Sequence, residues 1–393
     1  MPPTRVLALN AGSSSVKASL FELRGVGAEG DAPTGLCWED EIENGEQPLE
    51  RLLTPLWSGT RAIISGPSGI DVIGHRVVHG GALLTESTRV TPAVRAAIAR
   101  VAEYAPAHNA AALALMDAAT RLFGDQRAQV AVFDTAFHQT MAPAAFTYAG
   151  PHAWAEQGIR RFGFHGINHQ YVAHRAARLV HASQDAFRVV TCHLGSGCSL
   201  AAVRNGRSVD TTMGFTPLDG LPMARRSGAI DPGILIHLLR HGGYTTESLD
   251  HLLNRESGLA GLSGTDGDMR TVLAAVDAGD ERARLALDVF THKVRQGIAA
   301  MAATMNGLDA IAFTGGVGEH AARVRADVCA SLAFLGVAVD PDRNGSCAGE
   351  ADISAADARV AVLVIPAEEN WMVARECVRV VARPESDKSF TTT

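Results

Sequence analysis

The chain has 393 residues, of which 47% are hydrophobic and 20% charged, with 35 basic and 42 acidic side chains and a formal net charge of −7. This length predicts two domains with sizeable cores, and the composition excludes a disordered chain. The mild acidity argues against nucleic-acid binding through bulk positive charge. No apolar run reaches the ~18 residues of a membrane helix and no signal peptide is recognisable, so we expect a cytoplasmic α/β protein, most often an enzyme.

In the first half of the chain, two β-rich runs predict a hairpin. The runs VLALN (6–10) and VKASLFEL (16–23) flank a turn of small residues, AGSSS. Helical periodicity follows at 92–102, where Thr91 is a cap and Pro92 opens the first turn, and again at 109–122. A short buried strand at 130–133 ends at Asp134, and a Gly/Pro/aromatic stretch over 142–164 reads as a connection.

The second half begins with a similar hairpin. RVVTCHL (188–194) leads through GSGCS into the run LAAVRNGRSVDTT, 183 residues after the first Gly-Ser turn, counting from Gly12 to Gly195. The repeat predicts two related α/β domains that face each other across a cleft, with chance similarity of two hairpins as the alternative. Helices are expected at 234–240, 249–253 and 283–306, strands at 310–313 and 360–365, and a closing helix at 368–381.

The domain boundary is placed near Tyr148. Residues 1–147 with 368–383 would form an N-terminal domain, 148–367 a C-terminal nucleotide-binding domain, and 384–393 a disordered tail. Strands that alternate with helices exclude all-α and all-β classes.

Three Gly-rich turns are suited to binding phosphate. The turns at 12–15 and 195–199 offer consecutive backbone N–H groups and hydroxyls, and the turn at 313–319 closes a strand and opens a helix. Lys17 shares a sheet face with Ser15 and is one of only three lysines, so it is a candidate phosphate contact. Neither GxxxxGK[ST] nor GxGxxG is present, and the six scattered cysteines indicate neither zinc nor a disulfide framework.

Histidines and other polar residues occur repeatedly next to glycines and at the ends of predicted strands. Each single histidine is more often structural than catalytic, and His75, His169, His174 and His237 are assigned that way. Several such clusters, however, form ordered motifs: LNAGSSSVK, GHRVVHGG, APAHN, VFDTAFHQTM, RFGFHG, TCHLGSG, DTTMGFTPLDGL, RRSGAIDP, SGLAGLSG, DMR, FTGGVGEH and PAEEN. Their order resembles that of the acetate kinase (acetokinase) family, from Val6 to about Val381.

The resemblance implies a fold and an activity. The family belongs to the superfamily of sugar kinases, heat-shock-chaperone ATPases and actin, so we expect two duplicated actin-like (ribonuclease H-like) domains around a central nucleotide cleft. The implied reaction is the reversible, Mg²⁺-dependent transfer of a phosphoryl group from ATP to acetate, giving acetyl phosphate, a step toward acetyl-CoA. Mn²⁺ is a possible substitute, and a homodimer is expected that binds neither nucleic acid nor membrane.

The resemblance also implies roles for matching residues. Asn10 and Glu369 would serve Mg²⁺, Arg76 would bind the substrate carboxylate, and the catalytic residues would be Asp134, His165 and Arg226. The acyl pocket would involve Val78, Ala107, Phe164 and Pro217. The nucleotide-binding residues would be Lys17, His193, Leu194, Gly195, Ser196, Gly197, Asp268, Met269, Arg270, Gly316, Val317, Gly318, Glu319 and His320.

Physical reasoning supports most of this division. Phosphoryl transfer is mainly positioning and neutralisation of charge, and the arginine fork matches carboxylate and phosphoryl oxygens. A carboxylate substrate is already ionised at pH 7 and needs no general base. We therefore hypothesise that Asp134 orients an arginine or a Mg²⁺-bound water rather than accepting a proton.

Four positions depart from the family pattern. Ser196 and His320 stand where asparagine is usual, and Asn370 replaces a glutamate. Ala107 stands where leucine is common, which would enlarge the acyl pocket, so we expect propionate to be used appreciably alongside acetate. The alternatives are a propionate or short-chain acyl kinase, or a chaperone-like ATPase or actin-like assembly module, which would have no use for Arg76, His165 and Arg226 around a small pocket.

Overall fold

A computed structural model describes residues 3–12, 15–27, 31–43, 48–60 and 62–383, with only the backbone described at Pro48, Pro106 and Ala107. The chain divides into two compact units, one within 1–139, 164–171 and 368–393 and the other comprising 140–163 and 172–367. The boundary expected near Tyr148 lies inside the second unit, and 164–171 returns to the first. The tail expected at 384–393 lies outside the described residues.

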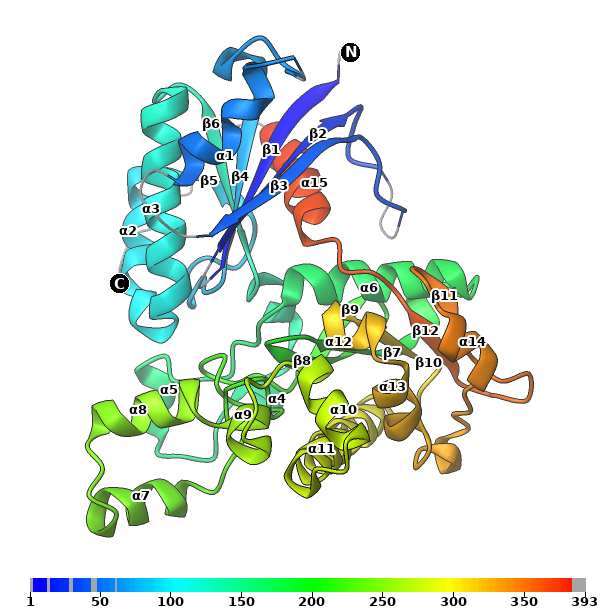
Figure 1. Ribbon diagram of the computed structural model, residues 1–393. Coiled ribbons are helices and arrows are strands. Elements are labelled where there is room, and N and C mark those ends of the chain that lie inside the picture. Colours follow the sequence, from blue (N-terminus) through cyan, green and yellow to red (C-terminus); the bar gives the residue numbers. More distant parts are fainter. Residues whose placement is uncertain (1–2, 13–14, 28–30, 44–47, 61, 384–393) are drawn as a thin grey trace. The chain divides into compact units, whose positions relative to one another are not determined.

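The first unit is built on a six-stranded mixed sheet in the order β3-β2-β1-β4-β6-β5 (Figure 1). The strands are β1 (Thr4–Ala11), β2 (Ser15–Leu23), β3 (Leu36–Glu43), β4 (Val72–Val77), β5 (Thr88–Arg89) and β6 (Ala128–Phe133). The helices are α1 (Pro48–Trp57), α2 (Pro92–Arg100), α3 (Pro106–Phe123) and α15 (Glu369–Val381). The predicted hairpin is present, because β1 and β2 pair antiparallel from Thr4–Leu23 to Ala11–Val16.

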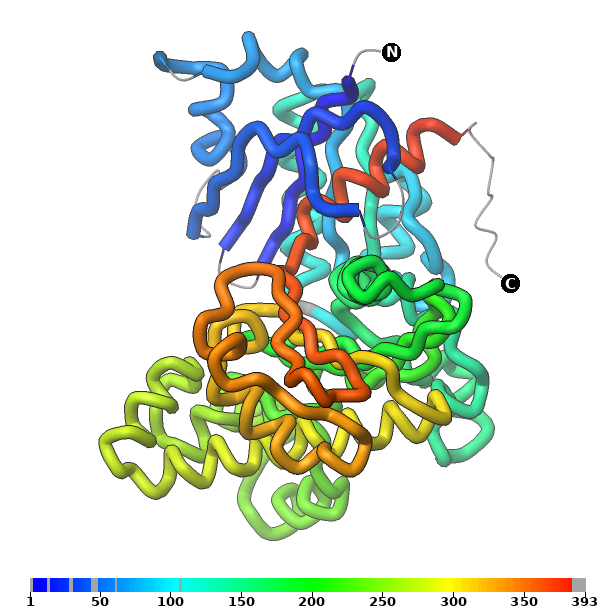
Figure 2. The backbone as a smooth tube through the Cα atoms, turned by 90° about the vertical axis from the view of Figure 1, so that its right-hand side faces the viewer, coloured from blue at the N-terminus to red at the C-terminus, as the bar shows by residue number. Residues whose placement is uncertain are grey.

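Helices cover both faces of this sheet. Leu7 and Leu9 of β1 belong to a buried cluster that includes side chains of α1 and α3. On the opposite face α15 packs against β1, β2 and β4, where it is red in Figure 2. The helix approaches β4 closely at Gly74, since a Cβ atom there would lie 2.5 Å from Cγ1 of Val373. Glycine at this position therefore lets α15 lie directly on β4, two residues before Arg76.

The second unit contains an equivalent sheet in the order β11-β12-β10-β7-β8-β9. Its strands are β7 (Arg188–Leu194), β8 (Cys198–Arg204), β9 (Arg207–Thr211), β10 (Ala310–Thr314), β11 (Ala351–Asp352) and β12 (Ala361–Val364). Its helices are α4 (Pro143–Phe146), α5 (His152–Glu156), α7 (Pro232–His241), α8 (Thr246–Arg255), α9 (Gly258–Ser263), α10 (Met269–Asp277), α11 (Glu281–Met305), α12 (Gly315–His320), α13 (Ala322–Cys329) and α14 (Pro341–Ser346). Helix α6 (Gly166–Leu179) begins in the first unit and ends in the second.

The two sheets share one topology. In each, the first three strands are antiparallel neighbours, and the first strand pairs in parallel with the fourth. The fourth strand pairs in parallel with the last one, whose outer edge carries a two-residue antiparallel strand. This correspondence confirms the predicted α/β class and the duplication inferred from the two Gly-Ser hairpins.

Two local predictions are wrong. The run LAAVRNGRSVDTT forms β8 and β9 rather than one strand, because Asn205 (φ 56°) and Gly206 (φ 70°) adopt the left-handed conformation of a two-residue hairpin turn. His237 is not a buried structural histidine, since it is exposed on α7 with its ring 5.3 Å from that of His241. His75, His169 and His174, the other three histidines interpreted as structural, are buried. Within the described residues, no helix combines the length and the apolar character needed to cross a membrane.

Candidate active site

Four predicted site residues of the first unit meet on the α15 face of its sheet. Asn10 lies near the end of β1, Arg76 near the end of β4, and Asp134 directly after β6. These three strands are parallel neighbours, so their carboxyl ends meet at one edge, which is where open α/β sheets bind ligands. Glu369 joins them from the first turn of α15.

Arg76 is at the centre of this group. Its Nε donates to Oδ1 of Asp134 at 3.1 Å and its Nη2 to Oδ2 at 2.8 Å, which makes a bidentate pair. Its Nη1 donates to Oε2 of Glu369 at 2.6 Å and to Oδ1 of Asn10 at 3.3 Å. The Nδ2 of Asn10 in turn donates to Glu369 at 3.2 Å. The orientation of the guanidinium plane is thus fixed from two sides.

The electrostatics of the group favour a permanently charged arginine. The Asp134 side chain is fully buried, while those of Arg76 and Glu369 are 16% and 15% exposed. Burial opposes the charge on Arg76, but the two carboxylates outweigh it and raise the pKa of the guanidinium above its ordinary value. Because the pairs are largely shielded from water, removal of Arg76 would leave two carboxylates without a cation.

The oxygen atoms of Asn10 and Glu369 are suited to Mg²⁺. Both oxygens converge on one cationic group, Nη1 of Arg76, so they already share a position that favours positive charge. Mg²⁺ takes one or two protein oxygen ligands and completes its shell with water and phosphate. The described residues contain no group of three or more His, Cys, Asp or Glu side chains able to hold a metal, and two oxygens fit Mg²⁺ shared with a phosphate ligand.

Lys17 lies directly opposite Asn10 in the β1–β2 register, so the two side chains project from the same face. Its Nζ is 3.1 Å from Oε1 of Glu39 on β3, and the side chain is 42% exposed. Ser15 of the same hairpin donates to Glu41 at 2.5 Å. Lys17 therefore lies beside Asn10, but its ammonium group is paired with Glu39 of β3.

The segment 164–166 is fixed to the end of β6. The Gly166 N–H donates to the carbonyl of Asp134 at 2.9 Å, and a Cβ at Gly166 would lie 2.1 Å from that oxygen. His165, just before it, has a left-handed backbone (φ 56°). Phe164 is buried, with its ring 5.4 Å from that of His79 and its carbonyl bonded to Nε2 of His138 at 3.0 Å. This close approach is the physical reason for glycine after His165.

Two further residues predicted for the acyl pocket belong to the first unit. Val78 is 7% exposed and follows β4 directly, next to His79, whose backbone is bonded on both sides by the Asn109 amide. Ala107 is the second residue of α3, and its side chain lies outside the described residues.

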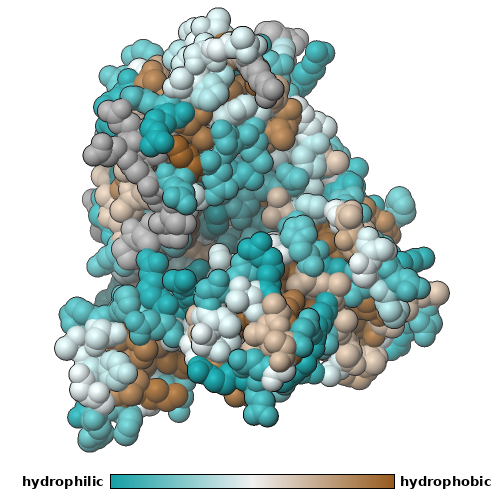
Figure 3. Space-filling view, in the orientation of Figure 1, coloured by the Kyte–Doolittle hydropathy of each residue, from teal (hydrophilic) through white to brown (hydrophobic). Residues whose placement is uncertain are grey.

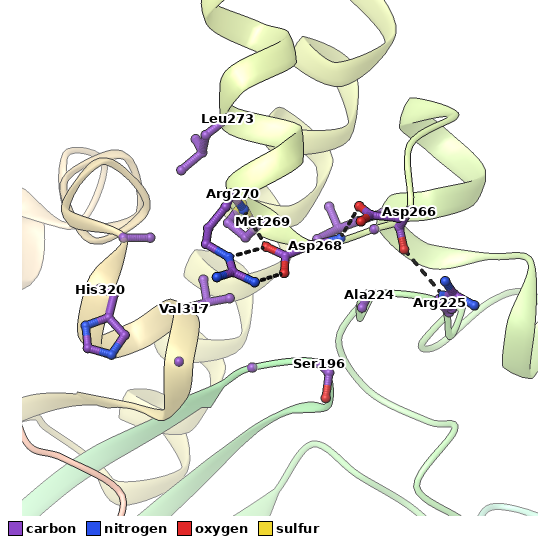
Figure 4. Close-up of a pocket in the computed structure, with 15 residues that line it drawn as sticks. Ser196, Ala224, Arg225, Asp266, Asp268, Met269, Arg270, Leu273, Val317 and His320 are labelled. Atoms are coloured by element: carbon purple, nitrogen blue, oxygen red, sulfur yellow. Dashed lines mark hydrogen bonds and ion pairs between the residues drawn. The ribbon is translucent and has the colours of Figure 1, made fainter. Parts of the chain in front are cut away.

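The second unit contains a cavity of about 560 Å³, which we call the α10–α12 cavity (Figure 4). It is lined by Gly195, Ser196, Ala224, Arg225, Leu259, Asp266, Gly267, Asp268, Met269, Arg270, Leu273, Gly316, Val317, His320 and Ala321. Three separate predicted nucleotide segments contribute to this list. The volume of the α10–α12 cavity is within the ~300–1,000 Å³ typical of small-molecule sites.

Glycine backbone geometry shapes the floor of this cavity. Gly315 opens α12 with φ 77°, and a Cβ there would lie 2.8 Å from the carbonyl of Leu194. Oε1 of Glu319 accepts from the Gly315 N–H at 2.9 Å and from the Ala367 N–H at 3.0 Å. Glu319 therefore stabilises the turn rather than lining the cavity.

A buried arginine holds the other end of α12. Arg325 is 1% exposed and donates from Nη1 to the carbonyls of Gly318 (2.9 Å) and Glu319 (2.7 Å). Its Nε donates to Oδ1 of Asn344 at 2.8 Å, and its Nη2 to the Asn344 carbonyl at 2.9 Å. The helix that presents Gly316, Val317 and His320 is thus fixed at both ends.

At the start of α10, two residues of the predicted nucleotide-binding motif, Asp268 and Arg270, bind each other. Asp268 caps the helix by accepting from the Arg270 N–H at 2.8 Å, and the Arg270 guanidinium forms a bidentate pair with the same carboxylate (Figure 4). These hydrogen bonds lower the pKa of Asp268. The Arg270 side chain is 91% exposed, so water screens this pair and it contributes little to stability.

Arg226 and Pro217 are in contact in the second unit. Nη1 of Arg226 donates to the Pro217 carbonyl at 2.6 Å, and burial lowers the pKa of the guanidinium. Arg226 is one residue beyond Arg225, which lines the α10–α12 cavity.

Not every predicted nucleotide residue lines the α10–α12 cavity. Leu194 and Gly318 are buried in the strand and helix that frame it, and His193, Gly197 and Glu319 are not among its lining residues. Sequence reasoning missed Ala224, Arg225, Leu259, Asp266, Gly267, Leu273 and Ala321. Most of them lie in or beside the RRSG, SGLAGLSG and DMR motifs, so proximity to those motifs was the available signal.

Known proteins resemble this chain over nearly its whole length. The model of the acetokinase family matches residues 5–375. The chain belongs to the acetokinase family. It is 50% identical to the acetate kinase of Gloeobacter violaceus over 95% of this chain and 98% of that one, and 46% identical to the acetate kinase of a Cyanothece species over 96% and 98%.

Solved structures of the acetokinase family share the fold. The acetate kinase of Porphyromonas gingivalis matches with a TM-score of 0.86 at 36% identity, covering 96% of this chain and 100% of that one. A propionate kinase from Francisella tularensis matches with a TM-score of 0.84 at 34% identity and the same coverage. The duplicated α/β fold is thus that of acetate and propionate kinases.

Proposed function

We propose that this member of the acetokinase family transfers the γ-phosphoryl group of ATP reversibly to acetate, giving acetyl phosphate and ADP. The observation that carries the proposal is the Arg76 guanidinium, oriented by Asp134 at the carboxyl ends of three parallel strands. A fixed, permanently charged fork is suited to a small carboxylate. The names of the acetate kinases that resemble this chain support the same substrate.

In this proposal Arg76 binds the acetate carboxylate and Asp134 orients Arg76. One acetate oxygen attacks the γ-phosphorus, a C–O–P linkage forms, the bond from the γ-phosphorus to the bridging oxygen breaks, and ADP leaves. Because acetate is ionised at neutral pH, no proton has to be removed from the nucleophile. Full burial and two bonds to Arg76 make Asp134 an orienting group rather than a base.

Asn10 and Glu369 would hold Mg²⁺, with Mn²⁺ as a possible substitute. Bound there, the ion would neutralise phosphate charge. His165 and Arg226 would stabilise the transferring phosphoryl group, and Lys17 would release Glu39 to contact a phosphate. The exposure of the Lys17–Glu39 pair makes that exchange inexpensive.

ATP would bind in the α10–α12 cavity. Leu259, Met269, Leu273 and Val317 offer apolar walls to a purine, and Gly316 lets the backbone approach the ligand closely. A Cβ at Gly316 would meet no atom within 4 Å, so open space is present above this turn. His320, where the family usually has asparagine, would read the purine edge.

The acyl pocket would involve Val78, Phe164, Pro217 and Ala107. A short-chain acyl kinase is the second candidate, because the propionate kinase from Francisella tularensis matches this fold as well as the acetate kinases do. The small side chain at Ala107 favours use of propionate alongside acetate.

We also propose that the protein is a cytoplasmic homodimer. Helix α7 exposes Ile234, Ile236 and Leu239 by 47%, 49% and 43%, and hydrophobic side chains reach the surface in the region of α7 and α8 (Figure 3). Apolar side chains gathered on one exposed helix mark an interaction surface. Light scattering coupled to size exclusion should give twice the 41.3 kDa of one chain, and Ile236→Asp should shift the mass toward one copy. A wild-type protein of one-chain mass at micromolar concentration would contradict this.

Trapping of acyl phosphate as hydroxamate tests the function. Purified protein with ATP and Mg²⁺ should form hydroxamate from acetate, appreciably from propionate and least from butyrate. Arg76→Ala should abolish the product, while Arg24→Gln, a change at an exposed arginine of the same unit, should not. ATP hydrolysis without any acyl phosphate would instead indicate a chaperone-like ATPase.

A further inference from the structure

A second cavity of about 510 Å³ lies in the second unit, and we call it the α11 cavity. Pro222, Ile230, Leu262 and Val289 supply apolar parts of its lining, and Lys293 and Glu256 supply one positive and one negative group. None of the residues assigned above to acetate, phosphoryl, metal or nucleotide lines it. Its size is that of a small-molecule site.

Two chain segments contribute to the lining of both the α11 cavity and the α10–α12 cavity. In the first segment, Ala224 and Arg225 line the α10–α12 cavity, whereas Pro222 and Ser227 line the α11 cavity. The second segment divides in the same way, with Leu259 facing the α10–α12 cavity and its neighbour Gly258 the α11 cavity. Neighbouring residues of one wall thus face different cavities.

This wall is held together by backbone hydrogen bonds. Leu259 N–H donates to the Met223 carbonyl at 2.9 Å, Ala260 N–H to Ala224 at 2.9 Å and Ser257 N–H to Arg225 at 3.0 Å. Gly258 has φ 62°, and a Cβ there would lie 2.2 Å from the Met223 carbonyl oxygen and 2.6 Å from that of Arg226. Because this shared wall is closely packed, a displacement of its residues on one side moves those on the other.

The charges of the α11 cavity restrict its ligand. Among the described residues, no carboxylate lies within 4.0 Å of the Lys293 ammonium, which projects from α11. Glu256 is bonded through Oε1 to Nε2 of His251 at 3.1 Å. A ligand that matches both groups and the apolar lining carries a carboxylate, an ammonium and an apolar body.

We propose that the α11 cavity binds an α-amino acid with an apolar side chain and that this ligand strengthens nucleotide binding in the α10–α12 cavity. The ligand carboxylate pairs with Lys293, its ammonium with Glu256, and its side chain packs against Ile230, Leu262 and Val289. A bound amino acid orders the wall that the two cavities share. The nucleotide then loses less of its binding free energy to ordering that wall. The coupling is reciprocal. The nucleotide effect rests on the proposed function, whereas amino-acid binding does not.

Calorimetric titration of the whole protein tests the ligand class. L-Valine, L-leucine and L-phenylalanine are the probes, with glycine, 4-methylpentanoate and 3-methylbutylamine as analogues that lack the side chain, the ammonium and the carboxylate. At least one probe should bind saturably, and every analogue at least tenfold more weakly. Absence of binding by all three probes, or equal binding of 4-methylpentanoate, would overturn the proposal.

Matched variants locate the site. Lys293→Gln and Glu256→Gln change exposed side chains and should each weaken the binding of the amino acid at least tenfold. Arg284→Gln, a change on helix α11, which also carries Lys293, should leave the binding unchanged. Equal binding in all three variants would place the amino acid elsewhere and refute the assignment.

Titration of ADP with and without the amino acid tests the coupling. A saturating amino acid should lower the Kd of ADP at least threefold, and ADP should lower the Kd of the amino acid by the same factor. An unchanged Kd would refute the coupling. Because both are binding measurements, they remain decisive even if the hydroxamate assay detects no acyl phosphate.

Discussion

Asp134 and Arg76 form a bidentate pair, with Nε–Oδ1 and Nη2–Oδ2 distances of 3.1 and 2.8 Å, and the aspartate is fully buried. This geometry assigns the carboxylate to orienting the guanidinium. A base would need access to the nucleophile, and an ionised carboxylate nucleophile has no proton to give.

Asp134→Asn should therefore lower kcat by at least 100-fold, because a neutral amide cannot hold the charged fork and leaves Arg76 with one carboxylate partner. Asparagine has nearly the same size and shape as aspartate, so circular dichroism should report a folded protein. Near-normal turnover of the variant with an unchanged Mg²⁺ requirement would contradict the orienting role.

Glu369→Gln should raise the Mg²⁺ concentration required for half-maximal activity at least tenfold, since one of the two proposed oxygen ligands loses its charge. Binding of Mn²⁺, followed by its electron paramagnetic resonance signal in the presence of ADP, should weaken in parallel. Asp71→Asn, a change at an exposed carboxylate of the same unit, is the control. Metal dependence equal to that of the wild type would argue against the metal assignment.

Arg325→Met should weaken ATP binding because the carbonyls of Gly318 and Glu319 lose their donor and α12 is released. We expect the KM for ATP to rise at least tenfold while the KM for acetate changes less than twofold. Asn344→Ala removes the acceptor of Arg325 Nε and the donor to the Ala322 carbonyl but leaves both carbonyl contacts of Nη1, so it should produce a smaller rise in the KM for ATP. Equal changes in both KM values would indicate a general loss of folding.

His75 should make the protein less stable in mild acid. Burial lowers its pKa from 6.5 to about 4, although its hydrogen bond to Gln129 opposes the shift. Between these values the unfolded chain binds a proton that the folded protein excludes, so the free energy of unfolding falls as pH decreases, by at most about 1.4 kcal/mol per pH unit. Urea unfolding at pH 6.5, 5.5 and 4.5 measures this slope. His75→Gln should have a smaller slope, and an identical slope would contradict the assignment.

The sequence predicted those parts of the fold whose signals are local. The two hairpins, the cap at Thr91 and the position of Asp134 after a buried strand all follow from short patterns, and the Thr91 side chain accepts from the Val94 N–H as expected. The Asn205–Gly206 turn was also a local signal, but it was overlooked within a longer β-rich run.

Other features depend on tertiary contacts. His237 was interpreted as a structural histidine, whereas helix α7 exposes it. The ion pairs of Arg76 join residues separated by 58 and 293 positions, and no spacing rule specifies such partners. Asn370 replaces a family glutamate and donates to Ser19 at 2.7 Å, a contact visible only once α15 is packed on β2.

The central claim is that Arg76 binds the carboxylate substrate while the nucleotide is bound mainly in the α10–α12 cavity of the second unit. Steady-state kinetics of Arg76→Lys, with acetate and ATP each varied, test it most directly. Lysine keeps the charge but not the fork, so we predict that the KM for acetate rises at least tenfold and the KM for ATP stays within twofold of the wild-type value. An unchanged KM for acetate, or an equal rise in both KM values, would contradict the account.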